Sequence, residues 1–219
     1  VYFTPTAATY NSTTGELVLT IGAHEITEGS GVQLADNSLT FTCDQGSGNY
    51  TYPRPGQDPY AGTNIYVTEV GYDDFDVDSA TYEPTTGVLT LESGGIGLQS
   101  GDKIRLVDES LIFTCSLDNN VSEHAYPRAT DPASAQWLTV SNVNGDQFEV
   151  NIGISSDTST HAFVHALSSA IQKQDGTITM NVGGAGTAAG SVHTFVSAAS
   201  NALQTGGAYT HRFIEATAN

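Results

Sequence analysis

The chain has 219 residues and carries 24 acidic residues against 6 Lys and Arg, giving a formal net charge of -18. This excess of negative charge disfavours binding to nucleic acid or to an anionic membrane surface, so we expect neither as a partner. No apolar run approaches the roughly 20 residues of a membrane-spanning helix. Because the first residues show neither an initiator Met nor a signal-peptide pattern, we expect a segment or a processed product of a longer protein.

The most informative feature is a duplication at a spacing of 72 residues. Without a gap, residues 8–43 and 80–115 share 17 identical residues in 36 positions. Self-similarity at a fixed period of this size indicates tandem structural units. We therefore predict a first β-unit at 1–79 and a second at 80–152, each of about 70 residues.

Both units alternate apolar and polar residues, the period-two pattern of half-buried strands. The apolar positions are Leu17, Leu19, Ile21, Val32, Leu34, Leu39 and Phe41 in the first unit, and Leu89, Leu91, Ile104, Leu106, Leu111 and Phe113 in the second. Further apolar stretches at 65–70 and 137–143 precede turn-rich residues 71–74 and 144–146, which predicts one hairpin in each unit. With about five or six short strands, each unit is expected to be a small β-sandwich or barrel.

The remainder, 153–219, carries a shorter repeat, His-x-Phe-(Val/Ile)-x-Ala, whose three copies begin at His161, His193 and His211. The apolar spacing around the first copy also fits a helix that stops at Gly176. We favour strands, because the other copies substitute Thr, Val and Ile freely and Gly-rich segments separate them. The predicted fold class is therefore all-β, with two tandem units and a β-rich repetitive C-terminal region.

The two ends of the sequence complete one repeat pattern. The third copy is followed only by residues 217–219, and an aliphatic residue that would continue it stands at Val1. We expect the pattern to run head to tail, along one long polypeptide or from one subunit into the next, by strand addition to an exposed edge. The predicted contact residues are Val1 and Phe3 at one end and Phe213 and Ile214 at the other.

A Tyr-Pro-Arg motif occurs once in each unit and ends in Arg54 and Arg128, two of only four arginines. Arg pairs bidentately with carboxylates, and Pro beside an aromatic residue stiffens an extended loop. We favour a structural clamp within each unit. The alternative is a contact with the acidic face of a neighbouring subunit.

Cysteines and histidines invite a disulfide or a metal site, and neither is expected. Cys43 and Cys115 end equivalent strands, which favours two buried thiols over one bridge. His161 and His165 have helical ligand spacing, but the other copies replace His165 and no Cys or carboxylate completes a set. The aspartates within 73–78 resemble a calcium loop, and the second unit has only a turn and a strand there, so weak surface calcium binding is left as an alternative.

Motifs of catalysis are missing from the sequence. It contains no P-loop, no nucleophile elbow and no carboxylate pair on a recognisable scaffold, so we expect neither an enzyme nor a cofactor. A different class of function stays open, a carbohydrate-binding or adhesin module. In that case the exposed aromatic residues Tyr50, Tyr52, Tyr60 and Trp137 would stack on sugars.

Four strings, at 4–10, 36–43, 126–132 and 193–198, resemble repeats of large virion structural proteins of marine tailed cyanophages. The resemblance covers nearly the whole chain, although the loop after Arg54 differs in length from its counterpart. It implies an extracellular structural component of a virion, such as a fibre, a tail appendage or a capsid-surface protein. Such a protein would form a homo-oligomer or polymer, with other virion proteins and host-surface glycans as further partners. The resemblance implies no catalytic residues.

Overall fold

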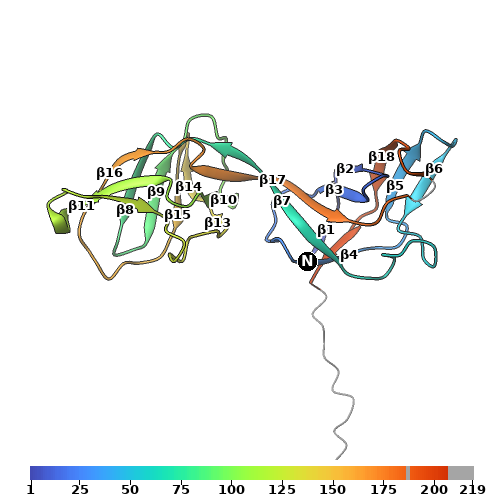
Figure 1. The fold of residues 1–219 in the computed structure, drawn as a ribbon, viewed down its shortest axis with the longest axis horizontal. Helices are drawn as coiled ribbons and strands as arrows, with labels where there is room; N and C mark the ends of the chain where they lie inside the picture. Colours follow the sequence, from blue (N-terminus) through green and yellow to red (C-terminus); the bar gives the residue numbers. More distant parts are fainter. Residues whose placement is uncertain (186–187, 207–219) are drawn as a thin grey trace, which may run out of the picture. The chain divides into compact units, whose positions relative to one another are not determined.

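The computed structural model describes residues 1–185 and 188–206. Strands make up nearly all of the regular structure in these residues, and a short 3-10 turn, Ser116–Asp118, follows β11 (Leu111–Cys115). The predicted all-β fold is confirmed. The chain divides into two compact units (Figure 1). Unit 1 comprises Val1–Gly22, Ile26–Val70 and the described residues from Thr177 onward, and unit 2 comprises Ala23–Glu25 and Gly71–Gly176.

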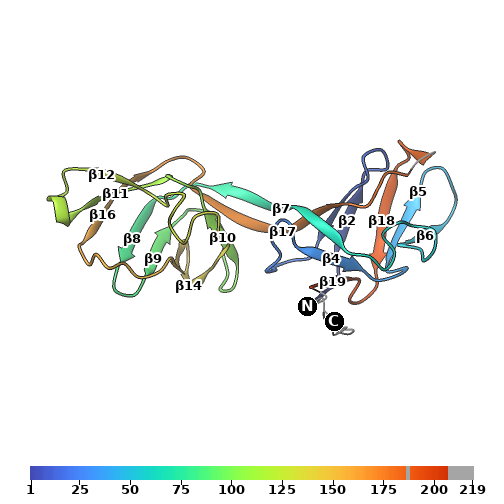
Figure 2. The ribbon, with the colours of Figure 1, turned by 60° about the horizontal axis from the view of Figure 1, so that its bottom comes forward.

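Unit 1 contains three groups of antiparallel strands. One group is β18 (His193–Ala198), β5 (Leu39–Cys43) and β6 (Asn49–Tyr52), which lie side by side in Figures 1 and 2. A second is β2 (Ala7–Tyr10), β3 (Glu16–Thr20) and the end of β17 (Ile171–Asn181). The third is β1 (Tyr2–Phe3), β19 (Leu203–Thr205), β4 (Gly31–Leu34) and the start of β7 (Ile65–Phe75).

Unit 2 repeats this plan. Its first group is β16 (His161–Ala166), β11 (Leu111–Cys115) and β12 (Glu123–Tyr126), seen together in Figure 2. Its second is β8 (Ser79–Glu83), β9 (Val88–Glu92), β15 (Gln147–Asn151) and β14 (Ser141–Asn144). Its third is the start of β17, β10 (Lys103–Leu106) and β13 (Leu138–Thr139).

The first two His-x-Phe copies form equivalent strands, one in each unit, and each pairs with the Phe-Thr-Cys strand of that unit. In unit 1, Phe195 of β18 lies opposite Phe41 of β5 with ring centroids 5.7 Å apart, and Phe163 of β16 lies opposite Phe113 of β11 at the same distance. The first copy is thus a strand, as favoured over the helix. The structure also groups residues 153–219 differently from the predicted separate region, because β16 belongs to unit 2 while β18 and β19 belong to unit 1.

Alternating burial along the strands builds a core in each unit, as the period-two pattern predicts. Leu17 and Leu19 of β3 and their counterparts Leu89 and Leu91 of β9 are at most 1% exposed. Each such side chain contributes about 1.5–3 kcal/mol when it is fully buried. Cross-strand partners complete the layer, with Ile178 and Met180 opposite β3 and Phe148 and Val150 opposite β9.

The two predicted hairpins have different outcomes. In unit 2, β14 and β15 form the expected hairpin around Gly145, whose φ of 63° is the left-handed conformation that glycine tolerates. In unit 1 the predicted turn at 71–74 is wrong, because β7 runs unbroken through it. β7 lies beside β17 in the sheet. The Thr68 hydroxyl donates to the carbonyl of Thr179 near the end of β17 at 3.1 Å, and the side chain of Gln172 at the start of β17 donates to Asp74 at 3.2 Å. In chain order, residues 71–176 therefore stand between two strands of unit 1 whose counterparts in unit 2 are joined by a short turn.

A close backbone approach recurs in both units. Gly15 and Gly87 precede β3 and β9 with φ of +79° and +75°, and a Cβ atom at either one would overlap the backbone of Gly183 or Gly153. The carbonyls of Gly183 and Gly153 also accept hydrogen bonds from tyrosine hydroxyls, as described below. Only glycine combines this left-handed conformation with such a close contact.

Candidate functional site: two matched cavities

Each unit contains a cavity at the same place in its fold. The cavity of unit 1 has a volume of about 540 Å³ and that of unit 2 about 490 Å³. Their matching lining residues are Tyr10 and Tyr82, Cys43 and Cys115, Tyr52 and Tyr126, Arg54 and Arg128, Asp58 and Asp131, and His193 and His161. Because the pairs come from equivalent strands and loops, the cavity is a property of the repeated unit.

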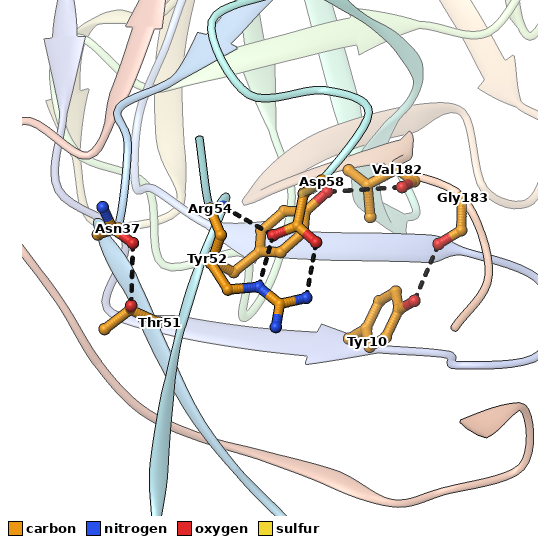
Figure 3. Close-up of polar contacts among 8 residues, drawn as sticks. All are labelled: Tyr10, Asn37, Thr51, Tyr52, Arg54, Asp58, Val182 and Gly183. Atoms are coloured by element: carbon orange, nitrogen blue, oxygen red, sulfur yellow. Dashed lines mark hydrogen bonds and ion pairs between the residues drawn. The ribbon is translucent and has the colours of Figure 1, made fainter. Parts of the chain in front are cut away.

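The Tyr-Pro-Arg motif of unit 1 ends in an internal clamp (Figure 3). The Arg54 side chain donates from Nε and Nη2 to the two carboxylate oxygens of Asp58 at 3.0 and 2.8 Å, and its backbone N–H donates to the same carboxylate at 2.6 Å. Burial by itself raises the pKa of Asp58, but the hydrogen bonds and charge of Arg54 together hold that pKa below its ordinary value.

Unit 2 has the same clamp between Arg128 and Asp131, with contacts of 3.1 and 2.9 Å from the side chain and 2.8 Å from the backbone. The acid lies three residues after Arg128 but four after Arg54, which matches the different loop lengths. The pKa of Asp131 is likewise lowered by its arginine against the effect of burial. These bonds agree with the clamp interpretation, and a contact of either arginine with a neighbouring subunit stays a prediction.

Tyrosine hydroxyls connect the cavity walls. Tyr10 donates to the Gly183 carbonyl at 2.8 Å, and Tyr82 donates to the Gly153 carbonyl at 2.8 Å (Figure 3 for unit 1). Tyr52 donates to the Val182 carbonyl at 3.5 Å. Burial, reinforced by a nearby aspartate, raises the pKa of both Tyr52 and its counterpart Tyr126. These hydroxyls therefore stay protonated.

The cysteine end distinguishes the two cavities. Both thiols are free. Cys115 is buried, as predicted, whereas Cys43 is half-buried, which differs from the predicted pair of buried thiols. Cys43 Sγ lies 3.8 Å from the carboxylate of the adjacent Asp44. Cys115 Sγ instead lies 3.9 Å from the carboxylate of Asp157, in the loop before β16. Among the described residues, a carboxylate from a loop distant in sequence therefore lies beside the thiol in unit 2 but not in unit 1.

Cys115, Asp157 and His161 each place one potential metal-ligand atom within 4.8 Å of the others. Hydrogen bonds from Ser159 are the main cause of the lowered pKa of Asp157, which keeps the carboxylate ionised. Thiolate, carboxylate and imidazole are all zinc ligands. Among the described residues, this is the one group that brings three such side chains together.

Sequence reasoning missed Asp157 because it paired His161 with His165. On a strand, His165 lies four positions away and is exposed, opposite Ile112. The available signal was a difference between copies, since Asp157 stands four residues before His161 whereas Ala189 stands four residues before His193.

The predicted terminal contact residues have two outcomes. Val1 directly precedes β1 and Phe3 is its last residue. β1 pairs with β19 of the same unit, and Phe3 lies opposite Leu203. Val1 is 79% exposed and Phe3 half-buried. Phe213 and Ile214, with the third His-x-Phe copy, lie outside the described residues.

The aspartates considered for calcium serve separate partners. Asp74 accepts from the side chain of Gln172, Asp76 from the amide of Ser169, and Asp78 from the amide of Gly94. These contacts spread the carboxylates along β7 and its loop.

Of the aromatic residues considered for sugar stacking, Tyr50 and Tyr52 line the cavity of unit 1. The Trp137 ring is covered on one face by the guanidinium of Arg105 at 4.9 Å from its centroid, with Tyr72 beside it. The two cavity tyrosines are thus better placed for a ligand than Trp137.

Comparison with known proteins identifies no relative, since no family model, no curated protein and no solved structure matches the chain. Within the residues that the structure describes, no helix has the length and apolar character needed to cross a membrane.

Proposed function

We propose that the chain is a non-enzymatic structural module of a virion fibre or appendage, which works outside the cell and assembles with further copies of its own unit. The observation that carries this proposal is a strand pair. In unit 1 this pair is β1 with β19, and its counterpart in unit 2 is the end of β7 with the start of β17.

The two strand pairs correspond residue by residue. Where β7 and β17 enter unit 2, the Asp76 carboxylate accepts the amide of Ser169 at 2.7 Å. The duplicated positions in unit 1 are Thr4 and Asn201, and the Thr4 hydroxyl accepts the amide of Asn201 at 3.0 Å. In unit 2 this strand pair continues into further strands of the chain, whereas in unit 1 the β1–β19 pair ends at an edge. This difference supports the use of the β1–β19 pair for joining another copy in an assembly.

The outer edge of β1 supplies a place for another strand. Thr205 donates its amide to the Val1 carbonyl at 2.9 Å. Because the direction of backbone groups alternates along a strand, the N–H and C=O of Tyr2 are directed away from β19. Among the described residues β1 is the edge of its sheet. An unpaired edge is a template for strand addition from another copy.

The charge of the chain suits assembly that depends on salt. A net charge of -18 repels like subunits, and the screening length falls from about 30 Å at about 0.01 M salt to about 3 Å at about 1 M. We therefore expect free subunits at low salt and assemblies at high salt.

Electron microscopy and sedimentation of the full chain across this salt range test the proposal. We expect regular assemblies in the wild-type protein and their loss in Tyr2→Pro, which removes the outward N–H but keeps the β19 pairing; Tyr2→Thr is the control. Monomers at every salt concentration would contradict the structural function. Assemblies that persist in Tyr2→Pro would contradict the joint at β1 alone.

A second candidate function, glycan binding, is favoured by the two cavities. Tyr50 is 44% exposed at the cavity of unit 1 and offers a ring face, whereas its counterpart in unit 2 is His124. Much of the remaining polar wall is engaged internally, including Arg54 and Tyr10. Glycan-array binding that is lost in Tyr50→Ala would support this function, and an empty array would remove it.

A further inference from the structure

We propose that Cys115, Asp157 and His161 form a binding site for one zinc-class divalent ion, in unit 2 and without a counterpart in unit 1. The three side chains come from adjacent parts of the fold. Cys115 ends β11, His161 begins β16 directly opposite it, and Asp157 lies in the loop that leads into β16. Strand pairing therefore fixes two of the three ligands before any ion binds.

The spacing fits a tetrahedral ion. Zinc lies about 2.3 Å from sulfur and about 2.0 Å from oxygen, which at the tetrahedral angle sets the two ligand atoms about 3.5 Å apart. Cys115 Sγ and Asp157 Oδ2 are 3.9 Å apart, and all three ligand atoms lie within 4.8 Å of one another. A small movement of side chains closes this set around an ion.

The imidazole gives an independent indication of a ligand. Nδ1 of His161 is buried and has no hydrogen-bond partner among the described residues. Burying a polar atom without a partner is unfavourable, and such atoms in native structures call for an explanation. A metal ion would satisfy an imidazole nitrogen through its lone pair. The equivalent His193 differs, because its Nδ1 lies 3.5 Å from the hydroxyl of Ser191.

Surrounding hydrogen bonds orient the other two ligands. The amide of Ser159 donates to Asp157 Oδ1 at 2.9 Å, which leaves Oδ2 directed toward the thiol. The amide of Leu117 donates to Cys115 Sγ at 3.5 Å, which holds the sulfur in place at the end of β11.

Three protein ligands leave the fourth tetrahedral position open. The site lies in the wall of the cavity of unit 2, which Asp118 and His124 also line. Water, or a donor group from another molecule, can therefore complete the coordination. In unit 1 the loop between Asn181 and His193 contains no carboxylate. Asp44 lies beside Cys43, but among the described residues these two do not form a three-ligand group with His193.

Titration of the full reduced chain with Co²⁺, followed by competition with Zn²⁺, tests this site. We expect one ion per chain, with tetrahedral d–d bands and a thiolate-to-cobalt charge-transfer band. Cys115→Ser should abolish the charge-transfer band and weaken Zn²⁺ binding about 100-fold or more, since even outer-shell changes cost 10–100-fold. Cys43→Ser, the matched change in unit 1, should leave both unchanged.

A second variant keeps the test independent of folding. Asp157→Asn preserves shape on a loop outside the core, and we expect it to weaken Zn²⁺ binding about 10–100-fold. Trp137 fluorescence and circular dichroism confirm the fold of each variant. The proposal is overturned if the wild-type chain shows no thiolate band, if Cys115→Ser or Asp157→Asn binds Zn²⁺ as tightly as the wild type, or if Cys43→Ser loses the ion.

Discussion

The two units reach the same strand pairings by different routes along the chain. Unit 2 closes its β14–β15 hairpin with a short turn at Gly145, whereas unit 1 closes the equivalent pair, β7 with β17, only after residues 71–176 have intervened. Loop-closure entropy grows slowly, by about 0.6 kcal/mol per doubling of length. Strands with matching side-chain patterns therefore pair in both units, whether a short turn or residues 71–176 separate them.

Matched core truncations test whether the units are independent, and they have the largest expected effect. Phe148→Ala in unit 2 should destabilise that unit by about 3–5 kcal/mol, and Ile178→Ala at the matching position of unit 1 by about 2–5 kcal/mol. Trp137 is the one tryptophan and lies in unit 2, so its fluorescence in urea reports on unit 2. Only Phe148→Ala should shift that transition, while circular dichroism detects both. An equal shift from Ile178→Ala would mean that the units unfold together.

The close glycine approach sharpens the comparison at an intermediate size. Gly87→Ala combines a left-handed φ with overlap on the backbone of Gly153 and should cost about 2–4 kcal/mol. Gly95→Ala is the control, because Gly95 has a φ of +76° with open space around it and should cost about 1 kcal/mol. Urea unfolding followed at Trp137 measures both. Equal losses would show that the contact with Gly153 adds nothing.

The arginine clamps have the smallest expected effect. Asp131→Asn and Asp58→Asn should each lower stability by about 1 kcal/mol at pH 7, since both arginines are more than one-third exposed and solvent screens the pairs.

The pH dependence of the clamps has a definite sign. The folded pKa of each aspartate lies below its ordinary value of 3.8. The stabilisation is therefore complete above the unfolded pKa and is lost as the pH falls through the folded pKa. Urea midpoints of the wild type and of Asp131→Asn should converge between pH 5 and the acid limit of folding, on the order of pH 2–3. A constant difference over this range would contradict the assignment.

Much of the fold is contained in the repeats themselves. The alternation at Leu17 and Leu19, or at Leu89 and Leu91, predicts strands with one buried face, and the structure has them. The Asn-Gly signal before Gly145 predicts a real hairpin. Local pattern suffices in these cases because a strand's buried face and a tight turn are short-range properties.

Partner choice is what the local pattern could not supply. Residues 71–74 are rich in turn formers, yet they continue β7, whose neighbour in the sheet is β17. The two Phe-Thr-Cys strands pair with the His-x-Phe strands in nested order, so that β5 takes the later copy and β11 the earlier one. The missed metal-ligand group follows from the same cause, since Asp157 reaches Cys115 only through the pairing of β11 with β16.

The nested order also decides when each strand's partner becomes available during translation. β1 leaves the ribosome first, but Tyr2 and its partner Gln204 stand at opposite ends of the described chain. When residue 176 emerges, every strand of unit 2 is available, while β1 and β5 still lack β19 and β18. Domains generally complete from the N-terminus onward during translation. We therefore expect unit 2 to complete its pairings before unit 1, and the earliest strands of the chain to keep open edges for longest.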